Sequence, residues 1–141
     1  MIKIEITNLA EFSKKMDALP GKVLAESART LREEAEEVME KSKQLVPRDL
    51  STLADSGHVP PTERERNAVS VSMVYGGEAK EYAIAVHEHP SIHSPESWSG
   101  KTIKWNVPGT GPKFLERPYL EALPKIPDRL REAFKRAFSG K

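Results

Sequence analysis

Apolar and charged residues alternate strictly at the start of the chain. Isoleucine occupies every second position from residue 2 to residue 6, with Lys3 and Glu5 between them. A period of two is typical of a strand that buries one face. We therefore predict a strand over residues 1–6.

The next signals are those of a short helix. The Asn8 side chain can accept hydrogen bonds from the first free amides of a helix, and Glu11 stands at the capping-box position three residues later. Because Pro20 and Gly21 interrupt the pattern, we predict that this helix ends near Ala18.

A long amphipathic helix is predicted over residues 22–45. Its apolar residues recur at spacings of three, four and seven, which places them on one stripe: Leu24, Ala28, Leu31, Ala35, Val38 and Leu45. Glutamates decorate the other side: Glu33, Glu34, Glu36, Glu37 and Glu40. They form either a solvated face or a contact with basic residues of a neighbouring subunit. Val46 and Pro47 end the helix.

Two segments are predicted to project as loops. Residues 47–67 are polar and rich in turn formers, with Pro60, Pro61 and a mixed-charge run at 63–66. Residues 89–112 are too long for a simple connection, and loops of that length are usually functional or ordered by partners.

The remaining period-two segments predict an antiparallel sheet. Residues 69–75 and 82–86 both alternate, and the glycines Gly76 and Gly77 between them favour a hairpin. A third strand, an edge strand or projecting arm, is predicted inside the second loop, where apolar residues again alternate: Ile103, Trp105 and Val107.

Two tryptophans in or beside that second loop, together with Ile103 of the same predicted strand, are candidates for a partner interface. Trp98 and Trp105 belong to the residue type most enriched at interface hot spots. Trp105 also shares a strand face with Ile103 and Val107, so burial in the chain's own core is the alternative.

Two short helices are predicted at the C-terminal end, over residues 114–123 and about 127–138, with Pro118 and Pro127 near their first turns. An apolar stripe follows every fourth position: Ile126, Leu130, Phe134 and Phe138. Basic residues occupy the rest of the last helix, and Arg129, Arg131 and Lys135 are interface candidates. They form a solvated face, or they meet nucleic acid or an acidic protein surface.

The composition indicates one globular domain over residues 1–141. Hydrophobic residues make up 38% and charged residues 30%, which excludes a disordered or membrane-embedded chain. The absence of cysteine excludes disulfides and thiolate metal sites. We expect no export signal and no membrane span. The fold class is α+β, with the long helix packed on a small antiparallel sheet.

Histidines near the end of the second hairpin strand are weak candidates for a metal site. His87 and His89 would point the same way from a strand, and Glu88 and His93 could add ligands suited to zinc. Such a site would belong to a metal-dependent hydrolase. The alternative is that these histidines are hydrogen-bonded at a strand end and in a loop, so neither a catalytic residue nor a cofactor is predicted.

Two further hypotheses, a catalytic triad and a phosphate-binding loop, concern residues that turns explain more simply. A Ser, His and Asp set can be assembled on paper from residues of the first loop: Asp49, Ser51, Asp55, Ser56 and His58. Turn and cap chemistry accounts for the same residues. Gly109 and Gly111 lack the lysine of a phosphate-binding loop and are flanked by prolines, so they predict a rigid turn.

Three motifs in order resemble the bacteriophage neck and tail-completion family, whose members are also labelled minor tail or minor capsid components. They lie at residues 46–49, 82–88 and 111–120. The matching positions are Val46, Pro47, Asp49, Tyr82, Ala83, His87, Glu88, Lys113, Phe114, Leu115 and Pro118. The family's first motif continues with Thr, Gly and later Arg, which this chain replaces with Leu50, Ser51 and Ala54.

The resemblance implies a non-enzymatic virion protein of a long-tailed phage, assembled in the host cytoplasm. Such a protein forms a homo-oligomeric ring at the head-to-tail junction, a hexamer in preference to a dodecamer. Its partners are head-completion or connector proteins and tail-terminator or tail-tube proteins, with non-specific contact to channel DNA. From the residues alone, the alternatives are the metal-dependent hydrolase and a nucleic-acid-binding module that uses the basic last helix.

Overall fold

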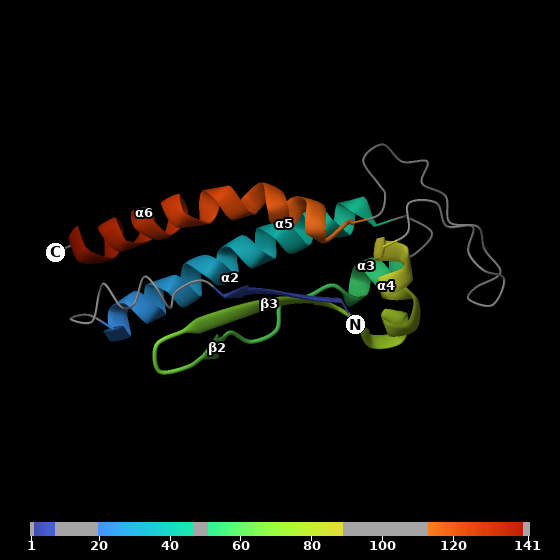
Figure 1. Ribbon diagram of the computed structural model, residues 1–141, viewed down its shortest axis with the longest axis horizontal. Coiled ribbons are helices and arrows are strands. Elements are labelled where there is room, and N and C mark those ends of the chain that lie inside the picture. The colour runs from blue at the N-terminus through green and yellow to red at the C-terminus, as the bar shows by residue number, and fades with distance from the viewer. Residues whose placement is uncertain (1, 8–19, 47–50, 89–112, 140–141) are drawn as a thin grey trace.

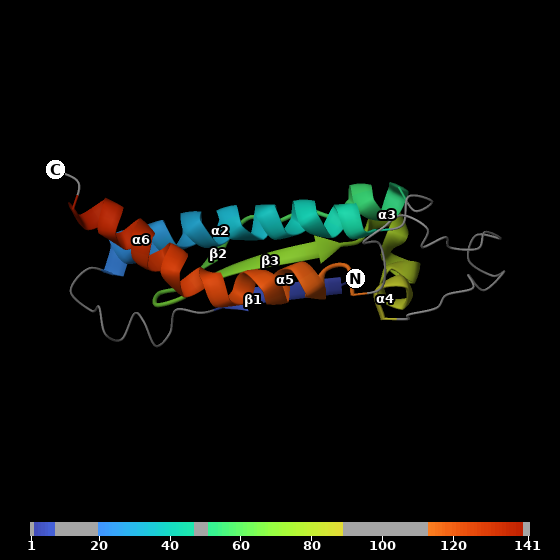
Figure 2. The same ribbon diagram turned by 90° about the horizontal axis from the view of Figure 1, so that it is seen from above.

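The computed structural model describes residues 2–7, 20–46, 51–88 and 113–139 of the chain. One long helix covers a face of a small sheet, and the C-terminal helices pack on that helix (Figure 1). The long helix α2 (Pro20–Leu45) lies between the sheet and the C-terminal helices, and α6 (Ile126–Ser139) runs antiparallel to it (Figures 1 and 2). This arrangement confirms the predicted α+β class.

Helix α2 forms the centre of the core. Its stripe is buried as predicted, since Leu31, Ala35 and Val38 are at most 1% exposed. At a rise of 1.5 Å per residue, its 26 residues span roughly 39 Å, which gives one helix room to contact both the sheet and the C-terminal helices.

The sheet has the order β1-β3-β2 and is antiparallel throughout. Strand β1 (Ile2–Thr7) pairs along its whole length with β3 (Val69–Tyr75), in the register that places Ile2 opposite Tyr75 and Thr7 opposite Ser70. The two-residue strand β2 (Glu63–Arg64) pairs with the start of β3. Both predicted strands, at residues 1–6 and 69–75, are confirmed.

The predicted hairpin between residues 69–75 and 82–86 is wrong. After β3 the chain enters the 3-10 turn η2 (Gly77–Ala79) and then helix α4 (Lys80–Glu88). Buried apolar residues of η2 and α4 are spaced by four and three: Ala79, Ala83 and Val86. The alternation that suggested a strand is incidental, because Ile84 is 50% exposed while Val86 is fully buried.

The prediction of an exposed loop at residues 47–67 is wrong for residues 51–59, whereas residues 61–67 are mostly exposed, as predicted. Helix α3 (Ser51–Ser56) buries Leu53 completely, and Val59 is only 7% exposed. His58 and Val74 exchange two backbone hydrogen bonds of 2.9 Å, so the segment adds a bridge to the edge of β3. The buried side chains of Leu53 and Val59 and the backbone hydrogen bonds of His58 therefore hold this polar, turn-rich segment against the rest of the domain.

The two C-terminal helices are confirmed. Helix α5 (Glu116–Ala122) is followed by the 3-10 turn η3 (Leu123–Lys125) and then by α6. Pro118 and Pro127 fall in the first turns of α5 and α6, where a missing amide costs no intrahelical bond. The stripe of α6 is buried through Phe134, and Phe138 at its end is 37% exposed.

Several predicted features lie outside the described residues. These are the short helix at residues 8–18, the second loop at 89–112 and the third strand inside it.

Candidate functional site

The second and third family motifs meet in space. The second motif lies in α4, and the third leads into α5 from Lys113. The Lys113 amide donates a 2.7 Å hydrogen bond to the His87 carbonyl oxygen, which joins the two segments. We call the side chains around this bond the motif junction: His87, Glu88, Lys113, Phe114 and Glu116.

His87 is the buried centre of the motif junction, with 3% of its surface exposed. Its Nε2 accepts a 3.4 Å hydrogen bond from the Glu116 amide, so the ring proton lies on Nδ1, 2.7 Å from Glu88 Oε1. The ring meets Phe114 edge to face at 5.0 Å, and Phe114 meets Tyr75 of β3 in the same way at 5.1 Å. One aromatic ring therefore connects α4, α5 and the sheet.

Charged groups close the motif junction at the surface. Lys113 Nζ lies 2.5 Å from Glu88 Oε2 and 3.0 Å from Glu116 Oε2. Hydrogen bonds from Lys113 and then from His87 lower the pKa of Glu88, and the bond to Glu88 raises the pKa of Lys113. Because Glu88 ends α4 and Lys113 precedes α5, these bonds hold the two helices together.

The motif junction also contains the only ligand set for a metal ion in the described part of the chain. One ligand atom each from His87, Glu88 and Glu116 lies within 4.8 Å of the others. The geometry predicted from the sequence is wrong, since His87 lies on a helix instead of a strand, while His89 and His93 lie outside the described residues. The Lys113 ammonium already pairs with both carboxylates. The geometry therefore favours an ion-paired clamp over metal chemistry.

Lys113 adopts a backbone conformation that favours glycine, with φ at +57°. We expect Lys113→Gly to unfold at a temperature roughly 2 to 8 °C above that of Lys113→Ala, because only glycine adopts this φ without steric cost. Both variants lose the ammonium, so the comparison isolates the backbone. Equal midpoints in thermal unfolding would show that position 113 carries no strain.

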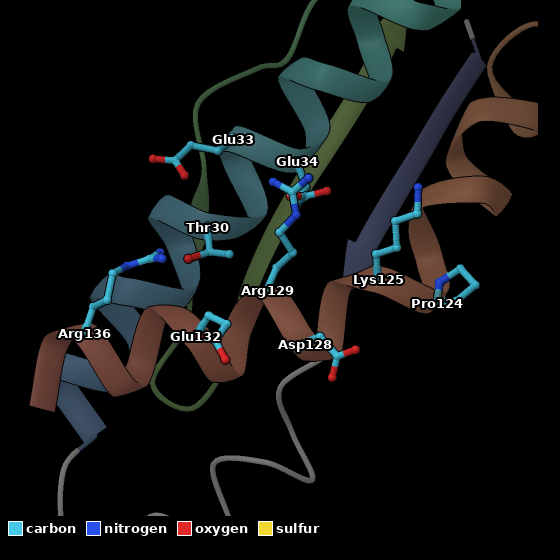
Figure 3. A pocket seen from close by; sticks show the side chains of 9 residues that line it. All are labelled: Thr30, Glu33, Glu34, Pro124, Lys125, Asp128, Arg129, Glu132 and Arg136. Atoms are coloured by element: carbon cyan, nitrogen blue, oxygen red, sulfur yellow. The ribbon is translucent and has the colours of Figure 1, made fainter. Parts of the chain in front are cut away.

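A second site is a groove of about 460 Å³ between α2 and α6 (Figure 3). The side chains that line this α2–α6 groove come from both helices and from η3: Thr30, Glu33, Glu34, Pro124, Lys125, Asp128, Arg129, Glu132 and Arg136. Arg129 reaches across it from α6, with Nη1 at 2.8 Å from Glu34 Oε1 and 3.5 Å from Glu37 Oε1. Part of the glutamate face of α2 therefore meets a basic residue of the same chain.

Glu34 is the buried charge of the α2–α6 groove, with 3% of its surface exposed. Burial raises the pKa of its carboxyl, and the charge of Arg129 opposes that rise. A carboxyl with a raised pKa binds its proton more readily in the folded chain, so its contribution to stability falls as the pH rises from about 4.5 through the folded pKa.

We therefore expect Glu34→Gln to remove this loss, so that the variant's free energy of unfolding falls less than the wild type's between pH 4.5 and pH 7. Urea unfolding at several pH values measures the difference. Glu33→Gln is the matched control, because it removes one exposed charge from the same helix turn. A Glu34→Gln profile parallel to the wild type would contradict the expectation.

The match to a known family covers more than half of the chain. Residues 10–88 match the family model described as "Bacteriophage HK97-gp10, putative tail-component". The chain belongs to this HK97 gp10-like family. The match spans α2, α3, β2, β3 and α4 and confirms the resemblance to phage tail and neck components. Comparison with curated proteins found no match, and comparison with solved structures found none either.

As a member of a phage tail-component family, the chain is a structural protein of the phage particle. Within the described residues, no helix combines the length and the apolar character needed to cross a bilayer. The motif junction lies at the edge of the match, since α4 is inside it and α5 is outside.

Some of the other motif residues are buried, and some lie outside the described part of the chain. Val46, Leu115 and Pro118 are buried. Tyr82 lies in α4, but its side chain is outside the described part, as are Pro47 and Asp49. The interface candidates Trp98, Ile103 and Trp105 also lie outside the described residues, together with Gly109 and Gly111.

Ser56 and His58, two members of the hypothetical Ser, His and Asp triad, make local hydrogen bonds typical of turns. Ser56 Oγ donates to the Leu53 carbonyl oxygen and accepts from the Gly76 amide, and His58 Nδ1 lies 2.9 Å from the Ser56 carbonyl oxygen. These are local bonds between side chain and backbone.

The basic residues of α6 are mostly paired with acids of the same chain. Arg131 pairs with Asp128 at 2.6 Å and Lys135 with Glu132 at 3.5 Å, while Arg129 crosses to α2. The buried position of Glu34 was not predicted from the sequence. A signal for it existed, because Glu34 stands three residues after Leu31 and four before Val38 on the apolar stripe.

Proposed function

We propose that this chain is the single-domain subunit of a homo-oligomeric ring at the head-to-tail junction of a long-tailed phage. The ring joins the head connector to the tail, and a hexamer is its proposed stoichiometry. Its neighbours are a head-completion or connector protein on one side and a tail-terminator or tail-tube protein on the other. The observation that carries this proposal is membership of a phage tail-component family over residues 10–88.

The described geometry supports a structural role. Both ring nitrogens of His87, the best candidate for chemistry, are engaged in hydrogen bonds. Both of its neighbouring carboxylates pair with Lys113. This arrangement holds α4 to α5 and leaves neither an activated nucleophile nor a poised base at the motif junction.

A closed ring needs two different complementary faces on each subunit. Figure 1 shows α6 and β2 on opposite sides of the molecule, with α2 and β3 between them. Both sides are charged and exposed, through the outer residues of α6 on one and residues 63–66 on the other. The subunit therefore presents two distinct surfaces for head-to-tail contact.

Deletion of the gene from the phage or prophage that encodes it tests the proposal. We expect full heads and separate tails in the lysate, with infectivity restored when the intact chain is supplied from a plasmid. Native mass measurement of the complementing protein, extracted from particles, should give six times the 15.8 kDa of one chain. Normal infectious particles from the deletion strain would refute the junction role.

A further inference from the structure

The α2–α6 groove contains a buried polar group that the folded chain leaves unsatisfied. Thr30 is 5% exposed, and its Oγ1 has no hydrogen-bond partner among the described residues. Burial of an unbonded hydroxyl is unfavourable, and native proteins rarely keep one without a reason. Figure 3 shows Thr30 on the α2 wall of the groove, with its hydroxyl on the side of Arg136.

The charges along the groove identify what kind of group is missing. Its four acidic residues are all paired with basic residues: Glu33 with Arg29, Glu34 with Arg129, Asp128 with Arg131 and Glu132 with Lys135. Two cations of the lining, Lys125 and Arg136, have no ion pair within the described residues. Lys125 acts on Glu34 only through its charge, without an ion pair. A hydroxyl donor and two cations that form no ion pair are complementary to a carboxylate.

The opposite side of the same molecule carries exposed carboxylates. Residues 63–66 read Glu, Arg, Glu, Arg and are all exposed. Glu63 and Glu65 form no ion pair with any described residue, and Glu63 lies on strand β2, which holds its backbone in the sheet. Strand β2 and helix α6, which lines the groove, lie on opposite sides of the subunit (Figure 1). One copy therefore cannot satisfy both from within, whereas a row of copies can.

We propose that the α2–α6 groove receives residues 63–66 of a second copy of this chain. The carboxylates of Glu63 and Glu65 meet Lys125, Arg136 and the Thr30 hydroxyl, and Arg64 and Arg66 face the acidic rim. This contact is heterologous, as a ring requires, and it rests on the proposed function. It also assigns the last helix to protein contact instead of channel DNA.

The absence of cysteine from the chain allows a direct test by cross-linking. The double variant Glu65→Cys with Arg136→Cys is treated in concentrated solution with a short reagent that joins two thiols. We expect a ladder of dimers, trimers and higher species on a denaturing gel. Each single variant should give no ladder, and Glu65→Cys with the exposed Lys80→Cys on α4 controls for random collision.

Thr30→Val distinguishes an effect on self-association from an effect on the stability of the fold. Valine has the shape of threonine without the hydroxyl, so we expect the unfolding midpoint of the variant to be unchanged or higher. Self-association measured by sedimentation should weaken by about fivefold or more, which is the effect of losing one hydrogen bond. Thr52→Val, at an exposed position of α3, should change neither. Unaltered association of Thr30→Val would overturn the role of the buried hydroxyl.

Charge exchange completes the test. Lys125→Glu with Arg136→Glu should abolish association, and addition of Glu63→Lys with Glu65→Lys in the same chain should restore it. An oligomer that forms without a cross-linked ladder, or that survives the groove reversal, overturns this contact while the ring remains supported. A chain that stays monomeric at every concentration also overturns it, whereas the deletion phenotype tests the junction role independently.

Nucleic acid is the competing occupant. Salt-sensitive binding of a duplex oligonucleotide that is lost in Lys125→Glu with Arg136→Glu, with no effect on self-association, would overturn the protein contact in favour of DNA.

Discussion

Phe114→Ala is expected to lower the free energy of unfolding by about 3 to 5 kcal/mol, the range for removing a large aromatic ring from a core. Phe114 is fully buried between Tyr75 of β3 and His87 of α4 and meets both rings edge to face. Its loss leaves a cavity at the point where the sheet, α4 and the start of α5 meet. Urea unfolding followed by circular dichroism measures the effect.

The matched control is Phe138→Ala, since Phe138 is 37% exposed at the end of α6. It loses mainly its contacts with Phe134 and the Lys22 ammonium, and we expect a cost of at most about 1 kcal/mol. A Phe114 variant that is no less stable than the Phe138 variant would show that the motif junction is not a structural clamp.

Gly57→Ala is expected to cost about 1 to 3 kcal/mol, the usual penalty for overpacking a core. A Cβ at residue 57 would lie 2.7 Å from Tyr75 Cε1 and 2.8 Å from Met39 Sδ. The tyrosine ring has little room to move, because its hydroxyl is hydrogen-bonded to Ser42 Oγ at 2.7 Å and Phe114 packs against it. Burial raises the pKa of Tyr75 to about 12, which reflects the same enclosure.

Gly21→Ala is the matched control for Gly57→Ala, and we expect it to stabilise the fold instead of destabilising it. No atom lies within 4 Å of a Cβ built at Gly21, which stands in the first turn of α2. Alanine is the better helix former, so we expect this variant to gain up to about 1 kcal/mol. Comparison of the two unfolding curves tests the close contact at Gly57, and equal stabilities would refute it.

Local pattern was sufficient for the longest elements. The period of α2 and the stripe of α6 predicted both helices, because in these helices the buried side chains follow the period of the backbone. The alternation of apolar residues with serine predicted the strand β3, although the structure buries both of its faces.

Pattern failed in short segments. Residues 82–86 satisfy a period of two and nearly a helical period as well, and the choice depends on where Ala79, Ala83 and Val86 can pack. Residues 51–59 contain only two apolar anchors, Leu53 and Val59, too few to show a period. Because residues 51–59 are mostly polar, their packing against the rest of the domain could not be predicted from the sequence.

The α+β class, the main helices and strands, and the ordered motifs of a phage tail-component family could all be predicted from the sequence. The clamp of His87, Lys113 and Glu116 and the inward turn of Arg129 to Glu34 became visible only in the folded chain. Backbone periodicity depends on neighbours within one turn or one strand, whereas these contacts join residues that become neighbours only when α4, α5 and α6 pack.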